Sequence, residues 1–212
     1  TYDHANTQIS LEAASGGGGG SETKAILPSL GNASSTEQYS WAHKEFPFGS
    51  SSSALTTQSI STDQPLCVPF IARRSDTLVE VTTYVSTAAG SITNMKIGVY
   101  TDNNGQPQTL LGVGSVDVSS TGQKTATLTA ESGQSLTTVA GSQYWIGFVR
   151  SASVSFTLGA TDKDKIPSFV WRTQYNANYG VVSMTGSNNQ LPSTFAFTTG
   201  FSWNVPAVGV RW

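Results

Sequence analysis

Short stretches in which apolar and polar residues alternate recur along most of this chain, and this period of two constrains the fold more than any other feature. Side chains on an extended strand point to opposite faces in turn, so the alternation predicts strands with one buried face. Gly, Asn, Pro and Ser separate the stretches, as expected for turns. About ten strands are predicted, at 78–86, 96–100, 112–118, 125–130, 144–149, 154–158, 168–175, 194–198, 207–212 and in the apolar run around Cys67.

Short strands at this spacing, with no helix of three turns after the N-terminal region, predict an all-β fold. We expect an antiparallel β-sandwich of jelly-roll type. The stretch 144–149 is apolar at every position, which indicates a central strand covered on both faces. Nine Phe, seven Tyr and five Trp among the 212 residues supply a core, so a disordered polar chain is excluded.

The N-terminal 30 residues differ in composition from the rest. Ser15 to Ser21 reads SGGGGGS, which is typical of a flexible linker, and the residues before it could form one or two helical turns. We therefore expect an extended tether used for assembly at 1–30 and one β-sandwich domain at 31–212. The chain begins with Thr1 rather than Met, which suggests a processed product or a piece of a longer protein.

Low charge limits the classes of partner. Only 11% of residues are charged, the net charge is −2, and no basic stretch could neutralise a phosphate backbone, so nucleic-acid binding is disfavoured. No segment approaches the ~20 apolar residues that cross a bilayer, so membrane insertion is not expected. The lone Cys67 lies in an apolar run and is predicted to be a buried structural thiol. Without disulfides, assembly in a reducing cytoplasm fits more easily than secretion, which stays open.

The oxygen-rich stretch TDNNGQP, residues 101–107, has two interpretations. A calcium loop needs several carboxylates that alternate along the chain, but Asp102 is followed by no other acid until Asp117. A hairpin turn needs residues that tolerate positive φ, and Asn104-Gly105 is a strong signal of that kind. The stretch therefore predicts a turn, and no metal site is predicted.

No catalytic constellation is predicted either. His4 and His43 lack the spacing of zinc ligands, and no Gly-x-Ser-x-Gly motif occurs. Asp162 and Asp164 each precede a lysine, which is typical of a solvated loop. We expect no enzyme activity and no cofactor; the alternative is a glycan depolymerase that uses these two acids together with Glu131.

The stretch SFVWRTQYNANYG, residues 168–180, predicts a ligand site. Aromatic faces stack on the C–H groups of sugars, while amide and guanidinium groups bond the hydroxyls. The candidate ligand-binding residues are Trp171, Arg172, Tyr175, Asn176, Asn178 and Tyr179. In the alternative interpretation, Trp171 faces the core and the rest is an ordinary loop. Trp203 and Trp212 are expected to be core or interface residues.

Four elements together resemble a module of phage tail-fibre and other virion proteins. They are an IGIY-like strand at Ile97–Tyr100, an Asp/Asn-Gly-x-Pro turn at Asp102–Pro107, a Leu-Leu step at 110–111 and a Tyr-Trp strand at Tyr144–Val149. The usual Gly after the turn proline is Gln108 here. The resemblance covers roughly residues 65 to 160, and some bacterial surface proteins carry a similar unit.

The resemblance implies a homotrimeric β-sandwich at or near the end of a fibre, used for attachment to a host. We therefore expect a non-enzymatic phage virion protein of tail-fibre or receptor-binding type, assembled in the cytoplasm of a bacterial host. Other virion proteins would contact residues 1–30, and a host surface polysaccharide would be the ligand. The alternatives are a capsid decoration or head-fibre protein and a secreted bacterial carbohydrate-binding module.

Overall fold

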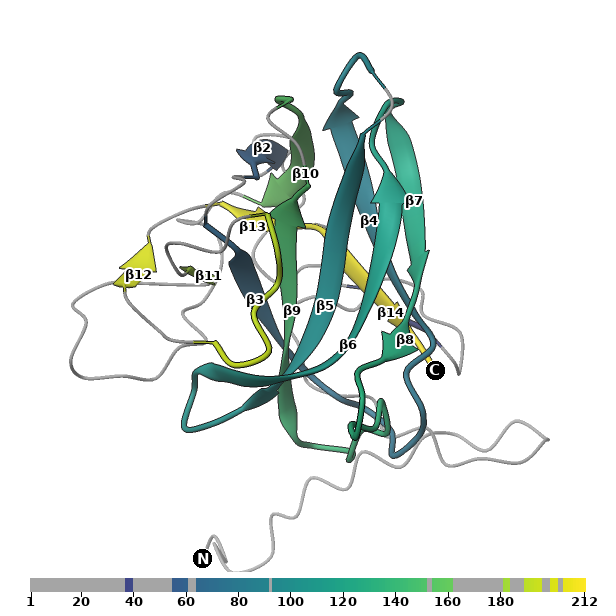
Figure 1. Ribbon diagram of the computed structural model, residues 1–212, viewed down its shortest axis with the longest axis vertical. Coiled ribbons are helices and arrows are strands. Elements are labelled where there is room, and N and C mark those ends of the chain that lie inside the picture. The colour runs from purple at the N-terminus through teal and green to yellow at the C-terminus, as the bar shows by residue number, and fades with distance from the viewer. Residues whose placement is uncertain are drawn as a thin grey trace, which may run out of the picture.

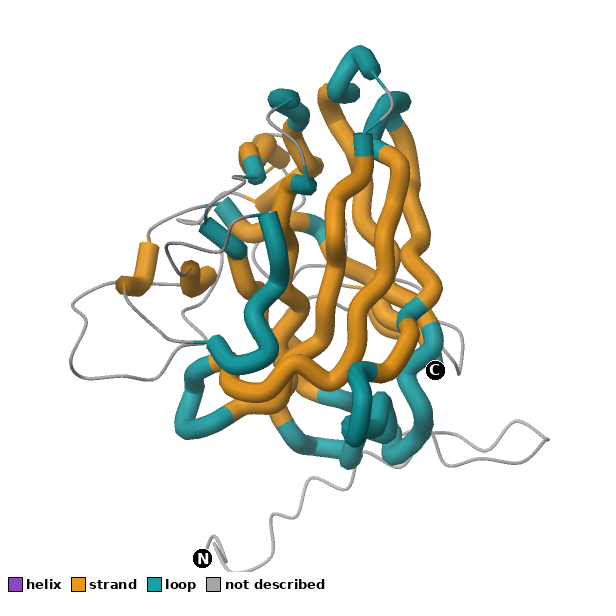
Figure 2. Tube along the Cα trace, viewed as in Figure 1, coloured by secondary structure: helices purple, strands orange, loops and turns teal. Residues whose placement is uncertain are grey.

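The fold is all-β, as predicted. The computed structural model describes residues 37–39, 55–60, 64–91, 93–151, 154–161, 181–183, 189–195, 199–201 and 204–212. Within these ranges the chain forms strands and loops and no helix (Figure 2). Two antiparallel sheets pack face to face as a β-sandwich (Figure 1).

The first sheet, here sheet A, is centred on β4. Strand β7 pairs with one edge of β4, and β14 and β10 pair with the other edge. Strand β10 also pairs with β2 and β13, and β1 pairs with β14. The bounds are β1 Glu37–Tyr39, β2 Leu55–Ser59, β4 Glu80–Thr87, β7 Gly122–Thr127, β10 Thr157–Thr161, β13 Val205–Pro206 and β14 Val208–Arg211.

The second sheet, sheet B, has the order β12-β11-β3-β9-β5-β6-β8. Its central strand β9 is buried at every position from Tyr144 to Val149, which confirms the prediction for that stretch. The bounds are β3 Leu66–Ile71, β5 Asn94–Asp102, β6 Pro107–Asp117, β8 Thr129–Ala130, β9 Gln143–Arg150, β11 Val181–Ser183 and β12 Thr199–Phe201.

The core lies between the sheets and follows from the alternation in the strands. Sheet A contributes Val81 and Val85, and sheet B contributes Ile97, Ile146 and Phe148, all with no exposed surface. Burial of these apolar side chains is the main favourable term in folding. The sandwich closes along the side where β6 and β7 lie next to each other (Figure 1).

Gly114 makes that closure possible. A Cβ atom at this position would lie 2.5 Å from the carbonyl oxygen of Thr127, so only glycine lets β6 approach the end of β7 this closely.

Several strand boundaries differ from the prediction. Strand β10 begins at Thr157 rather than 154, and Thr194 forms only an isolated bridge with Thr109, while β12 begins at Thr199. The predicted strand at 168–175 and the tether at 1–30 lie outside the described residues. Short strands such as β1 and β11 were not predicted, because three residues are too few to establish a period.

Candidate functional site

The TDNNGQP stretch is a turn, as predicted. It joins β5 to β6, and Asn104 and Gly105 have φ angles of 52° and 77°. The Asn103 N–H donates to the Gln106 carbonyl at 2.7 Å, and the Gln106 N–H donates back to Asn103 at 3.2 Å. Two central residues with positive φ match the right-handed twist of the flanking strands, so this sequence folds locally into a tight hairpin.

Asp102 holds this turn against the neighbouring strand β9. Its Oδ1 accepts hydrogen bonds from Trp145 Nε1 at 2.7 Å and from Gln143 Nε2 at 2.8 Å. Its Oδ2 accepts from the Gly105 N–H at 3.0 Å. Three donors therefore converge on the one carboxylate that a calcium loop would have used. The arrangement joins the turn to the Tyr-Trp strand.

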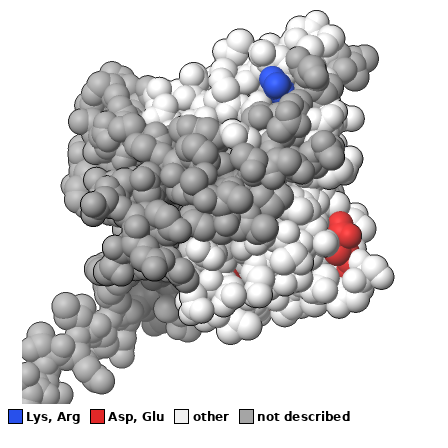
Figure 3. Space-filling view, turned by 60° about the vertical axis from the view of Figure 1, so that its left-hand side comes forward, with Lys and Arg blue, Asp and Glu red and all other residues white. Residues whose placement is uncertain are grey.

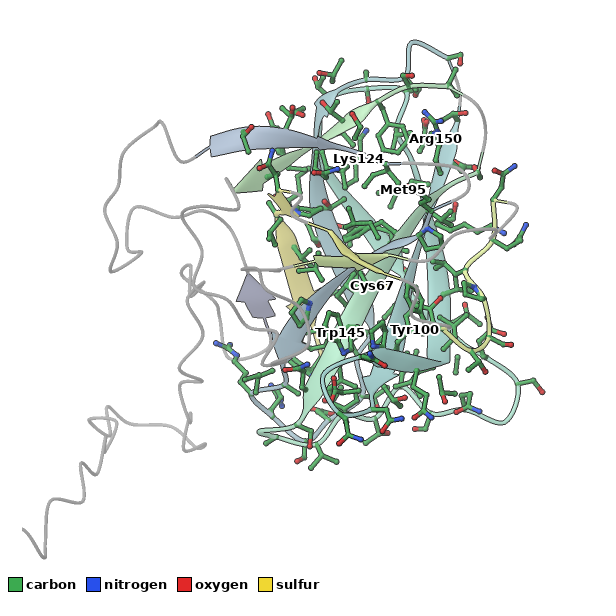
Figure 4. All side chains as sticks on the ribbon, turned by 90° about the vertical axis from the view of Figure 1, so that its left-hand side faces the viewer. Cys67, Met95, Tyr100, Lys124, Trp145 and Arg150 are labelled. Atoms are coloured by element: carbon green, nitrogen blue, oxygen red, sulfur yellow. The ribbon has the colours of Figure 1, made fainter. Side chains whose placement is uncertain are left out.

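The outer face of sheet B is covered. Its apolar residues pack under the segment 189–195, which contributes Leu191 and Phe195; the sheet residues are Cys67, Tyr100, Leu110, Trp145 and Val149. Figure 4 shows Tyr100 and Trp145 close together on the lower half of their strands, with Cys67 just above them. Burial raises the pKa of the Cys67 thiol well above its usual value. The prediction that Cys67 is buried is confirmed, and the aromatic rings of Tyr100 and Trp145 on this face have no exposed surface.

The covering segment 189–195 is held by specific contacts. The Tyr100 hydroxyl donates to the Pro192 carbonyl at 3.1 Å, and its ring meets Phe195 edge-on, with centroids 5.6 Å apart. Beside them, Gly98 lies opposite Gly147, and a Cβ at Gly98 would come within 2.6 Å of Leu191 Cδ1. Because neither glycine has a side chain, Leu191 can pack directly on the backbone of the two strands at this point.

In the part of the chain that the structure describes, the outer face of sheet A presents an exposed aromatic ring and carries the candidate site. Tyr84 on β4 is 43% exposed, which is unusual for so large a side chain in the centre of a sheet. Its partner on β7 is Gln123, and on the other side Gly159 of β10 lies beneath the Tyr84 ring. Thr57 of β2 pairs with Gly159 and completes the row. We call these four residues the Tyr84 row; it crosses the strands β7, β4, β10 and β2.

Hydroxyl side chains flank the Tyr84 row on both sides. On one side, the hydroxyls of Ser86 and Thr157 are hydrogen-bonded at 2.8 Å, and Ser59 pairs with Thr157. On the other side, the hydroxyls of Thr82 and Thr125 are hydrogen-bonded at 3.0 Å. Thr82 is buried and Thr125 is exposed. Ser59 is also exposed, and a hydroxyl that keeps free donor or acceptor capacity can bind a polar ligand, so Ser59 and Thr125 offer one such group on each side of the row.

Among the described residues, the charged side chains of this sheet stand apart from the Tyr84 row. Glu80 and Arg211 form an ion pair with each other at the far end of β4. Lys124 neighbours Gln123 in sequence, but successive strand residues point to opposite faces, and its Nζ donates to Ser120 at 2.7 Å. Low charge is general: on the face drawn in Figure 3 the described surface is almost entirely uncharged.

Most residues that the sequence singled out lie outside the described residues. This holds for the six ligand-binding candidates Trp171, Arg172, Tyr175, Asn176, Asn178 and Tyr179, and also for His4, His43, Asp162, Asp164 and Trp203. Trp212 is buried, and its Nε1 donates to the Thr138 hydroxyl at 2.7 Å, so the prediction of a core residue is confirmed.

Two findings concern the described ranges alone. They contain no group of three or more His, Cys, Asp or Glu that could hold a metal ion. Nor do they contain a helix long and apolar enough to span a bilayer.

The sequence did not indicate the Tyr84 row. Alternation in 78–86 correctly separated Val81 and Val85 from Tyr84. It was wrong at the start of the stretch, where it grouped Val79 with these valines and Leu78 with Tyr84, because Val79 is 37% exposed and Leu78 is fully buried. Gln123, Gly159 and Thr57 belong to other strands. Only the register of three strand pairs brings them beside Tyr84. An exposed tyrosine within a strand rich in threonine was the one available signal.

Known proteins resemble this chain only weakly, and only in structure. No family model and no curated protein sequence matches the chain. One similar solved structure holds the cysteine protease and lectin-like domains of Cwp84, a surface layer associated protein of Clostridium difficile. It has a TM-score of 0.42 and 17% identity, and the match covers 77% of this chain and 37% of that one.

A second solved structure, a Clostridial Cwp84 cysteine protease after propeptide cleavage, has a TM-score of 0.42 and 18% identity. The match covers 77% of this chain and 42% of that one. This chain therefore spans less than half the length of the solved chains that it resembles. A likeness of this size carries no information on function.

Proposed function

We propose that this chain is a non-enzymatic attachment module that binds carbohydrate on a cell surface. The observation that carries the proposal is the open outer face of sheet A. There an exposed Tyr84 ring lies among hydroxyl and amide side chains on a rigid sheet. Residues on strands hold their positions more precisely than residues on loops, as a binding platform requires.

The chemistry of this face matches that of a sugar. A pyranose ring has apolar C–H faces and a rim of hydroxyls, so an aromatic ring can stack on it while neighbouring polar groups bond the rim. Tyr84 supplies the ring; Gln123 supplies an amide that both donates and accepts. Hydroxyls on both sides can do the same.

The proposal that the module is non-enzymatic is supported by what the reactive groups do. Asp102 accepts three hydrogen bonds that fasten the turn. The Cys67 thiol is fully buried with a raised pKa, so it does not form a nucleophilic thiolate at neutral pH. Glu131 is half-buried, and the two other acids of the depolymerase alternative, Asp162 and Asp164, lie outside the described residues.

The second candidate function is that of a tail-fibre protein, in which the module would act as part of a phage virion. The observation that favours it is the bond between Asp102 and Trp145, which joins two elements of the virion-type pattern in space. Multiple copies on one fibre would raise the effective affinity of a weak single site. A capsid decoration protein and a secreted bacterial carbohydrate-binding module share the same sandwich and stay as alternatives.

The test uses the full chain with polysaccharides extracted from bacterial surfaces. We expect retention of the protein on at least one immobilised polysaccharide, with no shortening of that polymer over hours when it is analysed by size-exclusion chromatography. Failure to bind any of them would refute carbohydrate recognition. Shortening of the polymer would show an enzyme instead.

A further inference from the structure

We infer that the Tyr84 row takes an uncharged polysaccharide, laid across β7, β4, β10 and β2 with one sugar ring stacked on Tyr84, and that Gly159 positions the tyrosine ring. This inference rests on the proposed function and adds to it the place, the ligand class and a positioning residue.

Gly159 on β10 lies directly beneath the Tyr84 ring. It does not have a positive φ, so the backbone does not require glycine there. The Tyr84 ring lies close above it: a Cβ at Gly159 would lie 3.2 Å from Tyr84 Cδ1, 3.7 Å from its Cβ and 3.8 Å from its Cγ, so a larger residue there would push the ring aside by a few tenths of an ångström. The tyrosine ring thus lies over the place that a side chain on β10 would occupy. A ring in this position presents its other side to solvent.

The length of the Tyr84 row suits a polymer. Neighbouring strands are about 4.8 Å apart, so the path from Gln123 to Thr57 measures about 14 Å across three gaps. This length exceeds one sugar ring and suits a short run of a polymer. Gln123 and Thr57 are both exposed and stand at the two ends, where they can bond hydroxyls on either side of the stacked sugar.

The lack of charged groups in the Tyr84 row decides the ligand class. The Tyr84 row and the hydroxyls beside it contain no ionisable acid or base apart from the phenol. Among the described residues of this face, the charged side chains Glu80 and Arg211 pair with each other. An acidic sugar would lose hydration at this face without gaining a cation, whereas an uncharged sugar exchanges only hydrogen bonds. Binding should therefore be nearly independent of salt.

The experiment measures affinity for defined probes. The full chain is tested by affinity electrophoresis and calorimetry against dextran, mannan, galactan and a soluble β-glucan, and against alginate and polygalacturonate as acidic probes. We expect binding to at least one neutral polymer, with less than about a twofold change in affinity between 50 and 500 mM NaCl, because a neutral ligand leaves no charge to screen.

Variants then locate the site. Loss of the ring in Tyr84→Ala should weaken binding about tenfold, while Tyr84→Phe, which keeps the ring, should stay within about threefold. Gly159→Ala should weaken binding about threefold to tenfold by tilting the ring, without touching the ligand's polar contacts. Val139→Ala is the matched control, since Val139 is 55% exposed on a loop away from this face.

Each outcome has a consequence. Neutral binding that survives Tyr84→Ala overturns the inference and leaves the proposed function standing, with its site elsewhere. Binding only to the acidic polymers, lost at high salt, overturns the inference in the same way. If the wild-type chain binds no polysaccharide, both fail. If Tyr84→Ala does not fold, Gln123→Ala on β7 replaces it. Unchanged affinity of Gln123→Ala would then refute the Tyr84 row as the binding site.

Discussion

Asp102→Ala should be the most damaging single change in the turn between β5 and β6. The substitution removes the carboxylate that accepts hydrogen bonds from Trp145, Gln143 and Gly105. It alters no core volume, so any loss of stability comes from those bonds. The prediction therefore tests whether this turn is an architectural element rather than a binding loop.

The magnitude follows from what each donor can do afterwards. Trp145 has no exposed surface, so its indole N–H is left buried without an acceptor, which costs about 1–3 kcal/mol. Gln143 and Gly105 are half-buried and regain bonds to water, so each contributes about 0.5 kcal/mol. The expected total is about 3 kcal/mol, which for a chain of this length lowers Tm by about 6–12 °C. Asp102→Asn keeps one acceptor oxygen and should cost about 1 kcal/mol.

The assay is urea unfolding followed by far-UV circular dichroism, with a double-mutant cycle that adds Trp145→Phe. Because the phenylalanine has no N–H, Asp102→Ala in that background should cost about 1–2 kcal/mol less. Asp117→Ala is the matched control: Asp117 is exposed and its carboxylate accepts from the Ser119 N–H and hydroxyl, groups that regain bonds to water, so it should cost less than about 1 kcal/mol. A loss no larger than that control, or no coupling to Trp145, would refute the reasoning.

Four further predictions follow from the same structure and sequence. The Cys67 thiol should react with a disulfide reagent at pH 8 about a thousandfold more slowly than in urea, and fast native labelling would contradict its burial. Gly98→Val should destabilise the domain by about 1–3 kcal/mol in thermal unfolding, because it displaces Leu191; an unchanged Tm would contradict the tight packing. Light scattering should give a mass near three times 22.3 kDa, and a clean monomer at micromolar concentration would count against a fibre protein. Trp171→Ala and Tyr175→Ala should weaken binding to host cells without unfolding, whereas unfolding of the first would assign that ring to the core.

The parts of the fold that the sequence predicted are those governed by local rules. Alternation identifies β4 and β5, an all-apolar run identifies β9, and Asn104-Gly105 identifies the hairpin turn. In each case neighbouring residues along the chain decide the conformation. Where tertiary contacts decide, the prediction was wrong or absent: 194–195 is a covering segment rather than a strand, because the β6 edge holds it through the Leu110 and Gln108 backbone groups.

The covering segment also explains why aromatic residues alone are a poor guide to a binding site here. Tyr100 and Trp145 lie on an outward-facing side of sheet B, where a sequence pattern would allow a ligand to reach them. Leu191 and Phe195, from a distant part of the chain, occupy that side instead. Exposure therefore depends on which segments pack on each sheet, and no local pattern encodes that.

The candidate face of sheet A depends on long-range register in the same way, and this gives it a property that a loop site lacks. Gln123, Tyr84, Gly159 and Thr57 come from four strands and meet only because their registers agree. A slip of one residue in β4 would turn the core residues Val81 and Val85 outward and Tyr84 inward, and a slip in β10 would do the same to Leu158. Burial of Val81, Val85 and Leu158 therefore fixes the positions of the exposed residues between them. Packing of the core thus sets the geometry of the proposed platform. Substitutions of the exposed platform residues leave that packing unchanged, so they should alter binding without altering Tm.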